Sequence, residues 1–328
     1  MSEQPSKGRR ERIRALRRRI LLALTGQILL RRKQIPEKAR RILWYYDWST
    51  LGDSIMDLSQ RFAIPEGIEL NLLMPNGPAT IFADDSRIAK TFRCIEEVDR
   101  DYDFILIQDL STRSLSFKLK HFFATPFASV YEHLQEERFS RIDFAAGRVS
   151  ELFRLPPFPP LPPSLTVPAR QNAETEKMIV VAIGGNDPRR SYQDWAGVLE
   201  NLVVNVLPGQ RTPHFLLVGS GEAAKQALAT IPKDFLAAHC DSLIDADDPR
   251  ELVAAIAGCA AFIGADGGLM HIAAACDKPG LALFCEIRPE WRLHPERQLG
   301  ALFHDTDINS LSSKHIAEAF IASLTAKH

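Results

Sequence analysis

The stretch AAFIGADGGLMHIAAACDKPGLALF, residues 260–284, decides the fold of this chain. An apolar run leads to Asp266, two glycines follow, and small residues then continue at helical spacing up to a second apolar run. This order predicts a strand, a turn, a helix over 268–276 and another strand. At the carboxyl end of a parallel strand, the first amides and the positive dipole of the next helix favour a diphosphate. We therefore expect Asp266, Gly267, Gly268 and His271 at a phosphate site, where Asp266 could also cap the helix.

The same alternation of apolar runs and helix-compatible segments extends over most of the chain. Three such runs occupy 41–46, 69–74 and 104–108, and a second series occupies 178–183, 214–218, 242–244, 260–265 and 280–284. Helices are expected between the later runs, at 191–206, 222–230, 248–258 and 268–276. The pattern predicts an α/β protein with parallel sheets and crossover helices.

A proline-rich segment, LPPFPPLPPSLTVP at 155–168, separates the two series. Proline fits neither a helix interior nor a central strand, so we expect a stiff extended spacer there rather than a proline-rich ligand motif. The predicted organisation is an arm at 1–40, a first Rossmann-like domain at 41–154, the linker at 155–168 and a second Rossmann-like domain at 169–328. A length of 328 residues suits two such domains.

A second motif, WSTLGDSIMDLSQRF at 48–62, follows the first apolar run. Asp53 is expected near the start of a helix, where the dipole favours the ionised carboxylate. Such a carboxylate can accept a proton from an attacking hydroxyl group. A purely structural N-cap is the alternative role.

Together these motifs resemble those of glycosyltransferase family 9, the heptosyltransferases. Asp266, Gly268, His271 and the pair Lys278-Pro279 match that family's strand, Asp-Thr/Ser-Gly-x-x-His and Lys-Pro pattern, and Asp53 matches its N-terminal Gly-Asp motif. Gly267 departs from the pattern, because the family usually has a hydroxyl residue there. The loop CEIRPEWRLHP after Phe284 departs as well, so the chain resembles a divergent member of this family.

The resemblance implies a GT-B fold, in which the second domain binds a nucleotide-sugar and the first presents the acceptor to Asp53 as general base. Arg189 or Arg190 would contact the diphosphate in place of the family's lysine, and Glu222 would contact the nucleoside. The implied reaction is an inverting, metal-independent transfer from ADP-heptose to a lipopolysaccharide or other envelope glycan. No metal or further cofactor is expected, since helix dipole and basic side chains would stabilise the leaving diphosphate.

The N-terminal arm differs in charge from the rest of the chain. Residues 1–41 carry fourteen Lys/Arg and three acidic residues, although the whole chain has a net charge of −1. Ile13, Leu16, Ile20, Leu24 and Ile28 lie at helical spacing, and the uncharged run at 20–30 is too short to span a bilayer. We expect residues 9–33 to form a helix that lies on the anionic inner face of the cytoplasmic membrane, or else a solvated or disordered basic tail. Nucleic-acid binding is disfavoured, since the arm lacks aromatic residues and the body is acidic.

The sequence also allows other functions. Gly219-Ser-Gly221-Glu-Ala-Ala224 matches a dinucleotide-binding fingerprint, with Asp241 or Asp245 downstream, which would indicate an NAD-dependent oxidoreductase. A GT-B protein without activity could bind a glycan or act as a scaffold, and sugar epimerases share the fold. The DxD-like segments at 101–103 and 245–247 imitate metal sites, but the first precedes its strand and the second follows a weak strand among many acidic loop residues. Five scattered cysteines without a CxxC pair indicate neither disulfides nor zinc and suit a cytoplasmic protein.

Overall fold

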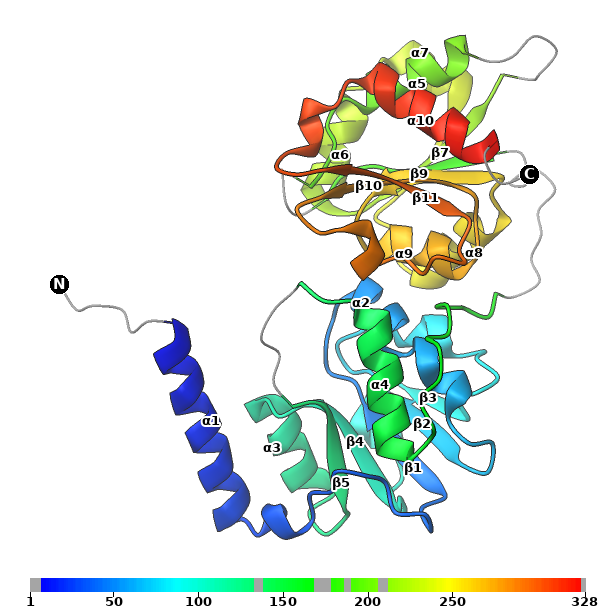
Figure 1. Ribbon diagram of the computed structural model, residues 1–328. Coiled ribbons are helices and arrows are strands. Elements are labelled where there is room, and N and C mark those ends of the chain that lie inside the picture. Colours follow the sequence, from blue (N-terminus) through cyan, green and yellow to red (C-terminus); the bar gives the residue numbers. More distant parts are fainter. Residues whose placement is uncertain (1–6, 133–137, 168–177, 186–189, 206–211, 326–328) are drawn as a thin grey trace.

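The computed structural model describes residues 7–132, 138–167, 178–185, 190–205 and 212–325 (Figure 1). Two parallel sheets, each covered by helices, follow one another along the chain and face each other across a packed interface. The predicted α/β class with two parallel sheets is therefore confirmed.

The first sheet has the strand order β3-β2-β1-β4-β5. Its strands are β1 (Arg41–Tyr45), β2 (Glu69–Leu73), β3 (Lys90–Phe92), β4 (Phe104–Asp109) and β5 (Phe127–Tyr131). Side chains alternate between the two faces, so Trp44 packs toward helices α2 (Leu51–Asp57) and α4 (Arg141–Phe153), and Leu43 packs toward α3 (Thr112–His121). Burial on both faces explains why these strands read as continuous apolar runs.

The second sheet has the order β11-β10-β9-β6-β7-β8, with every pairing parallel. Its strands are β6 (Met178–Ala182), β7 (His214–Gly219), β8 (Cys240–Ile244), β9 (Ala261–Ala265), β10 (Gly280–Cys285) and β11 (Leu299–His304). The helices of this domain are α5 (Trp195–Val204), α6 (Gly221–Ala229), α7 (Lys233–His239), α8 (Pro249–Gly258), α9 (Gly268–Ala275) and α10 (Ser313–Thr325).

The eight apolar runs identified in the sequence are all strands, but three further strands were missed. β3 has only three residues, β5 follows a turn within an aromatic stretch, and β11 alternates buried with more exposed residues. Helix α5 also begins later than expected, because Asp194 caps it by accepting a hydrogen bond from the Gly197 amide at 3.0 Å.

The two domains share one apolar core. Buried residues of the α2–α4 face of the first sheet continue without interruption into residues beneath α8 and α9 of the second domain. Helices α2 and α9 pack against each other at this junction (Figure 1). The proline-rich segment contains no helix or strand between Leu155 and Val167 and lies along the first domain, where Gln60 exchanges two hydrogen bonds of 2.9 Å with the backbone of Leu161.

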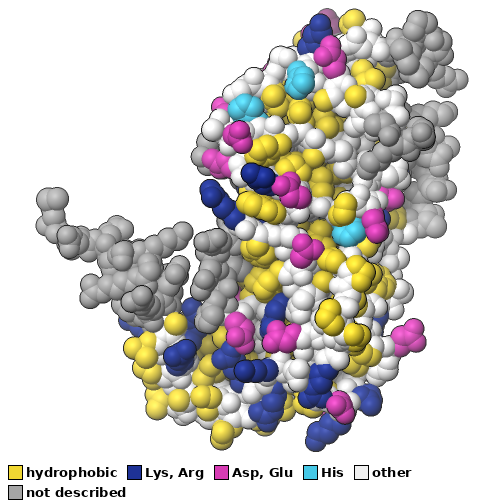
Figure 2. All heavy atoms as spheres, viewed as in Figure 1, with side chains coloured by type: hydrophobic (Ala, Val, Ile, Leu, Met, Phe, Trp, Pro, Cys, Tyr) yellow, Lys and Arg dark blue, Asp and Glu magenta, His cyan; other side chains and the backbone are white. Residues whose placement is uncertain are grey.

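The described part of the arm starts with helix α1 (Lys7–Leu24), which projects beside α3 (Figure 1). Its end is anchored: Leu22 is buried in the first domain, and the backbone of Arg32 donates to Phe127 O at 2.8 Å. The buried Lys118 binds Gln27, just after the helix. By contrast, Leu16, Ile20, Leu24 and Ile28 are exposed. The helix predicted over 9–33 is confirmed only as far as Leu24: Gly26 is left-handed, with φ of 68°, and Ile28 lies in the short 3₁₀ helix Gln27–Leu29 rather than on the same helical face. Hydrophobic and basic side chains lie side by side at the lower left of the surface shown in Figure 2. No helix in the described part of the chain is long and apolar enough to cross a membrane.

Candidate active site

The two predicted motifs lie where the strand order of each sheet reverses direction. In the first sheet, the loop holding Asp53 follows β1, which adjoins β4 at the reversal. In the second sheet, the Arg190 loop follows β6 and the Asp266 loop follows β9, and these two strands are neighbours. Ligands of open α/β sheets bind at such switch points, beyond the carboxyl ends of the strands. The topology thus brings the motifs together although they are distant in sequence.

Asp266 is held by an arginine rather than used as a helix cap. Its carboxylate forms an ion pair with Arg190, and its side chain is 3% exposed. Gly267 is the N-cap residue of α9, and no side chain caps that helix, so the expected capping role of Asp266 is wrong. Nε of Arg190 is buried and has no hydrogen-bond partner among the residues that the structure describes, which leaves a donor near α9. Arg189 lies outside the described residues.

His271 is buried between the domains. Its Nε2 lies 3.9 Å from Asp266 Oδ1. Burial lowers the pKa of His271 to about 3, although the carboxylate of Asp53 acts to raise it. The imidazole is therefore neutral near pH 7 and can serve as a hydrogen-bonding group rather than a cation.

Two glycines allow α2 and α9 to approach closely. A Cβ atom on Gly52 would overlap the imidazole of His271, and one on Gly268 would lie 2.9 Å from Cδ2 of Leu51. The nearest atom to a Cβ on Gly267 would be 3.9 Å away, and its φ of 175° is extended backbone. Gly267 is thus the glycine of the motif that faces open space.

Asp53 lies in the first turn of α2, and its side chain is 29% exposed. The N-cap residue of this helix is Thr50, so Asp53 is not the N-cap. Its Oδ2 accepts a hydrogen bond from Thr50 Oγ1 at 2.6 Å, and its Oδ1 lies 3.3 Å from Arg141 Nη2. Each oxygen of the carboxylate is therefore held by one neighbour and retains capacity to accept another hydrogen bond.

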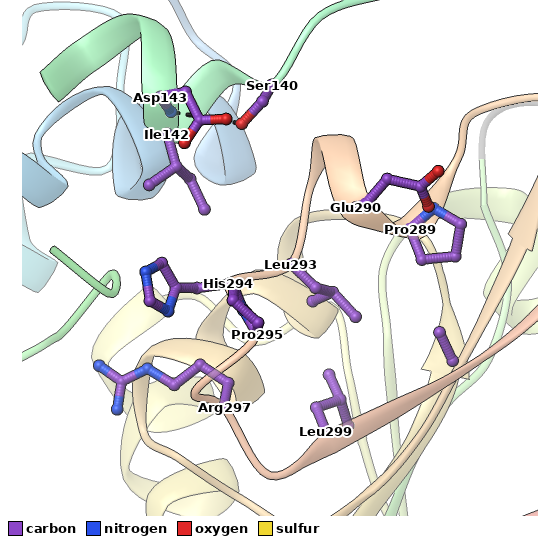
Figure 3. Close-up of a pocket in the computed structure, with 11 residues that line it drawn as sticks. Ser140, Ile142, Asp143, Pro289, Glu290, Leu293, His294, Pro295, Arg297 and Leu299 are labelled. Atoms are coloured by element: carbon purple, nitrogen blue, oxygen red, sulfur yellow. Dashed lines mark hydrogen bonds between the residues drawn. The ribbon is translucent and has the colours of Figure 1, made fainter. Parts of the chain in front are cut away.

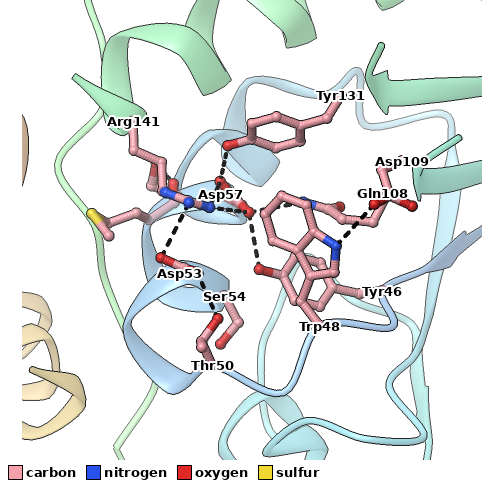
Figure 4. A network of polar contacts seen from close by, with 12 residues as sticks. Tyr46, Trp48, Thr50, Asp53, Ser54, Asp57, Gln108, Asp109, Tyr131 and Arg141 are labelled. Atoms are coloured by element: carbon pink, nitrogen blue, oxygen red, sulfur yellow. Dashed lines mark hydrogen bonds and ion pairs between the residues drawn. The ribbon is translucent and has the colours of Figure 1, made fainter. Parts of the chain in front are cut away.

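Beneath Asp53 lies a buried network around Asp57, which the sequence reasoning missed (Figure 4). The Asp57 carboxylate accepts hydrogen bonds from Tyr46 at 2.9 Å, Tyr131 at 2.5 Å, Gln108 at 2.8 Å and Arg141 at 3.1 Å. Burial raises the pKa of Asp57 to about 6, against the lowering effect of Arg141 and the tyrosine hydroxyls. The only sequence signal was the spacing of Asp53 and Asp57, which places both on one face of a helix.

The divergent loop after Phe284 joins the second domain to the first. Arg292 Nη1 donates to Phe139 O at 3.2 Å, the ring of His294 donates to Pro160 O at 3.0 Å, and Arg297 donates to Pro163 O at 2.5 Å. Arg292 is also buried close enough to Asp266 and Asp53 for both carboxylates to act on its pKa, which burial lowers. The motif comparison passed over Arg292 because this loop departs from the family pattern.

A pocket of about 520 Å³ opens beside this loop, between the two domains (Figure 3). The first domain contributes Ser140, Ile142 and Asp143, which flank Arg141 in the sequence. The second domain contributes residues from the loop and from β11. Its lining mixes apolar side chains with Asp143, Glu290 and His294. Such a surface offers hydrogen bonds and an apolar contact, which suits a sugar ring.

Of the remaining predicted residues, Glu222 and Asp245 lie near the carboxyl ends of the strands, whereas Asp241 lies near the start of β8, at the opposite end. Glu222, in the first turn of α6, is exposed and accepts a hydrogen bond from Gln226 at 3.2 Å. Of the two acids in the dinucleotide fingerprint, Asp245 bonds the Gly221 amide and Lys225, and Asp241 lies 3.2 Å from His214. The fingerprint follows β7, one strand away from the switch point. A dinucleotide site is therefore not favoured.

The DxD-like segment at 101–103 lies in the first domain, at the amino end of β1 and therefore at the opposite end of that sheet from Asp53. Asp103 accepts hydrogen bonds from the amides of Arg40 and Arg41, which precede and begin β1. This carboxylate therefore has a structural role at the edge away from the switch point.

Two facing Rossmann-like domains with their switch points opposed define the GT-B class. Comparison with solved structures confirms it. The chain is similar to E. coli ADP-heptose LPS heptosyltransferase II, with a TM-score of 0.69, 19% identity, and coverage of 88% of this chain and 99% of that chain. It is also similar to an E. coli heptosyltransferase solved with ADP, with a TM-score of 0.64, 12% identity, and coverage of 87% and 98%.

The sequence comparisons confirm the resemblance to glycosyltransferase family 9. Residues 210–303 match the model of that family, described as glycosyltransferase family 9 (heptosyltransferase). The chain is 31% identical over 157 residues to lipooligosaccharide heptosyltransferase 2 of Haemophilus influenzae. That match spans 40% of this chain and 42% of the relative.

Proposed function

We propose that this protein is an inverting glycosyltransferase that moves a sugar from a nucleotide-diphosphate donor to an envelope glycan. The observation that supports it most is the position of Asp53 beside His271 and Asp266, each motif at the switch point of its own sheet. Because the relatives are named as ADP-heptose and lipooligosaccharide heptosyltransferases, we propose ADP-heptose as donor and a lipopolysaccharide core as acceptor.

The proposed reaction is a single displacement. The acceptor oxygen attacks the anomeric carbon, its proton passes to Asp53, and the bond from that carbon to the diphosphate oxygen breaks with its electron pair going to the diphosphate. One displacement inverts the anomeric configuration. Arg190, Arg292 and the first amides of α9 would stabilise the charge that develops on the diphosphate, so that no metal ion is required.

The nucleoside would lie along the same sheet edge, toward Glu222. The acceptor glycan would enter from the first domain, and the pocket beside Arg292 offers a place for one of its sugar rings. In this arrangement the second domain holds the donor and the first domain holds the acceptor. It agrees with the location of the Asp266 motif in the second domain and of Asp53 in the first.

A screen for donors tests this assignment most directly. A panel of nucleotide-sugars and nucleotides that includes ADP-heptose and ADP should contain at least one compound that raises the melting temperature, by preferential binding to the folded state. Asp266→Ala and His271→Ala should weaken that shift, whereas Asp53→Asn should preserve it. If no nucleotide in the panel raised the melting temperature, a glycan-binding scaffold would replace the transferase as our conclusion.

A catalytic measurement tests the role of Asp53. Asparagine keeps the size of the side chain and can still accept a hydrogen bond from Thr50, so folding and donor binding should change little. Turnover should fall by about 10²–10⁴, the usual contribution of a positioned general base. An Asp53→Asn variant as active as the parent would remove this mechanism.

We also propose that α1 holds the protein on the inner face of the cytoplasmic membrane, close to a lipid-anchored acceptor. This proposal is supported by the exposure of Leu16, Ile20 and Leu24 at helical spacing on a basic helix, with the exposed Ile28 shortly after it. Because Leu22 and the residues after it pack on the first domain, a truncation should end before them. The Leu16→Gln/Ile20→Gln variant should lose binding to vesicles with anionic lipid, while Phe62→Gln, an exposed apolar residue elsewhere, should not. Equal vesicle binding by both variants would refute a role for these exposed side chains.

A further inference from the structure

Asp53 and Asp57 lie one helical turn apart on α2, and a single arginine, Arg141, bridges them. Arg141 is the first residue of α4, so it reaches both carboxylates from a separate, rigid element. Its side chain is 8% exposed, and Nη1 contacts both oxygens of Asp57 at 3.1 and 3.2 Å while Nη2 lies 3.3 Å from Asp53. The arginine therefore connects a buried anion to a partly exposed one.

The buried end of this connection is fixed. Trp44 Nε1 donates to Gln108 Oε1 at 3.0 Å, so the Gln108 amide must present its NH₂ group to Asp57. Two tyrosine hydroxyls and the guanidinium also donate to Asp57. An ionised carboxylate can accept all of these bonds, because it has about four lone-pair sites and no hydrogen to donate. Exchanging it for an amide would place an NH₂ group against one or more of these donors.

Aromatic rings enclose the guanidinium between its two carboxylates. The Arg141 Cζ atom lies 5.3 Å from the ring centroid of Trp48, 5.6 Å from that of Tyr131 and 5.9 Å from that of Phe139. These contacts limit the rotamers available to Arg141, and the planar guanidinium adds directional hydrogen bonds. The group that faces Asp53 is consequently pre-organised before any substrate binds.

From this geometry we propose that Arg141, anchored by Asp57, is a positioning residue that holds the carboxylate of Asp53 in the orientation required to accept the acceptor's proton. Thr50 fixes one oxygen of Asp53 and Arg141 fixes the other. When Asp53 takes up the proton it becomes neutral, and Asp57 keeps a counter-charge beside Arg141 during the step. The inference rests on the proposed function, since it gives Asp53 its supporting residues.

The test compares two buried aspartates of the same domain. Asp57→Asn breaks the network under Asp53, and Asp85→Asn breaks the equally buried pair of Asp85 with Arg61, whose Nη2 lies 2.5 Å from Asp85. Both variants should melt at lower temperature than the parent. Kinetics are measured below both transitions, with ADP-heptose and a deacylated lipopolysaccharide core.

Asp57→Asn should lower kcat by about 10- to 100-fold, the loss expected from misplacing a catalytic group by about 1 Å, with little change in KM. Asp85→Asn should retain the parent's kcat. Arg141→Lys should retain more activity than Arg141→Gln, because lysine preserves the positive charge. It should remain less active than the parent, because lysine lacks the planar guanidinium that contacts both carboxylates. The proposal is overturned if Asp57→Asn and Asp85→Asn have equal kcat, or if Asp57→Asn raises only the KM for the acceptor.

A crystal structure of the full-length Asp57→Asn variant provides a readout that is independent of activity. Arg141 is expected to leave its position beside Asp53, and the Asp53 carboxylate to rotate away from Thr50. Unchanged contacts at Asp53 would overturn the positioning role even if no acceptor were found. If the parent transferred no sugar but its Asp53 rotated in the Asp57→Asn variant, the proposed function would fail while the structural dependence of Asp53 on Asp57 would hold.

Discussion

The contact between Gly52 and His271 permits a sharp prediction about the domain interface. Gly52→Ala places a methyl group in overlap with the imidazole and 3.1 Å from its Nε2. His271 is 4% exposed and packed between the domains, so the ring has little room to move. Overpacking of this kind costs roughly 1–3 kcal/mol. Since 1 kcal/mol shifts the melting temperature of a domain of 150–250 residues by about 2–4 °C, we expect a decrease of about 2–12 °C.

Two other glycines supply matched controls. A Cβ on Gly67 or on Gly147 would have no atom within 4 Å. Gly67→Ala should leave the melting temperature close to that of the parent. Gly147→Ala, inside α4, should raise stability by about 0.5–1 kcal/mol, because alanine forms helices more readily than glycine. Calorimetry of the three variants, with turnover measured in parallel, checks the reasoning; a Gly52→Ala variant that is as stable and active as Gly67→Ala would refute it.

Three further variants test single features of the structure. Gly267→Ser should be tolerated, because the serine side chain would enter open space at the N-cap of α9. It should also increase donor affinity, because it restores the hydroxyl group that the family usually has at this position. Isothermal titration with the donor checks this. His271→Gln should flatten the pH dependence of stability between pH 3 and 6.5. The pKa of His271 is about 3 in the folded protein and 6.5 in the unfolded chain, so the unfolded chain binds more protons in this pH range. The parent therefore loses stability as pH falls through the range, and the variant should not. Burial lowers the pKa of Lys118 from 10.5 to about 8. The parent should therefore gain stability from this group as pH rises from 8 to 10.5. Lys118→Met should lack that gain, which urea titrations at several pH values would measure.

The sequence predicted the architecture well because buried parallel strands have a strong local signal. Apolar runs such as 41–46 and 178–183 are buried on both faces of a sheet, and each is a strand in the structure. The missed strands β3 and β11 lie at the two sheet edges, where one side lacks a neighbouring strand and side chains are more exposed. Local hydrophobicity is weaker at such edges, so pattern reasoning loses them first.

Residues of the candidate site were predictable only where they belong to a local motif. Asp53, Asp266 and His271 belong to motifs in which a strand is followed by a loop and a helix, an order that a sequence pattern can recognise. Arg141 and Arg292 reach the site from α4 and from the divergent loop, and only tertiary packing brings them beside Asp53. Arginine outside a recognised motif is most often exposed, so its residue type alone does not indicate a site. Packing converts these two arginines into parts of the site: Arg141 is enclosed by side chains of the first domain, and Arg292 reaches across the interface to Phe139 O.

The glycines of the two motifs illustrate how a local pattern can be right about residue type and incomplete about cause. A glycine after a strand is expected where a backbone must approach phosphate closely, and this applies equally to Gly267 and Gly268. In the structure Gly268 faces Leu51 and Gly52 faces His271, so each makes room for the other domain, while Gly267 faces open space. Larger residues at 52 or 268 would push α2 away from α9 and carry Asp53 away from the second-domain motif. These two glycines therefore set the separation between the proposed base and the proposed donor site, and that separation must be correct to within about 1 Å for efficient transfer.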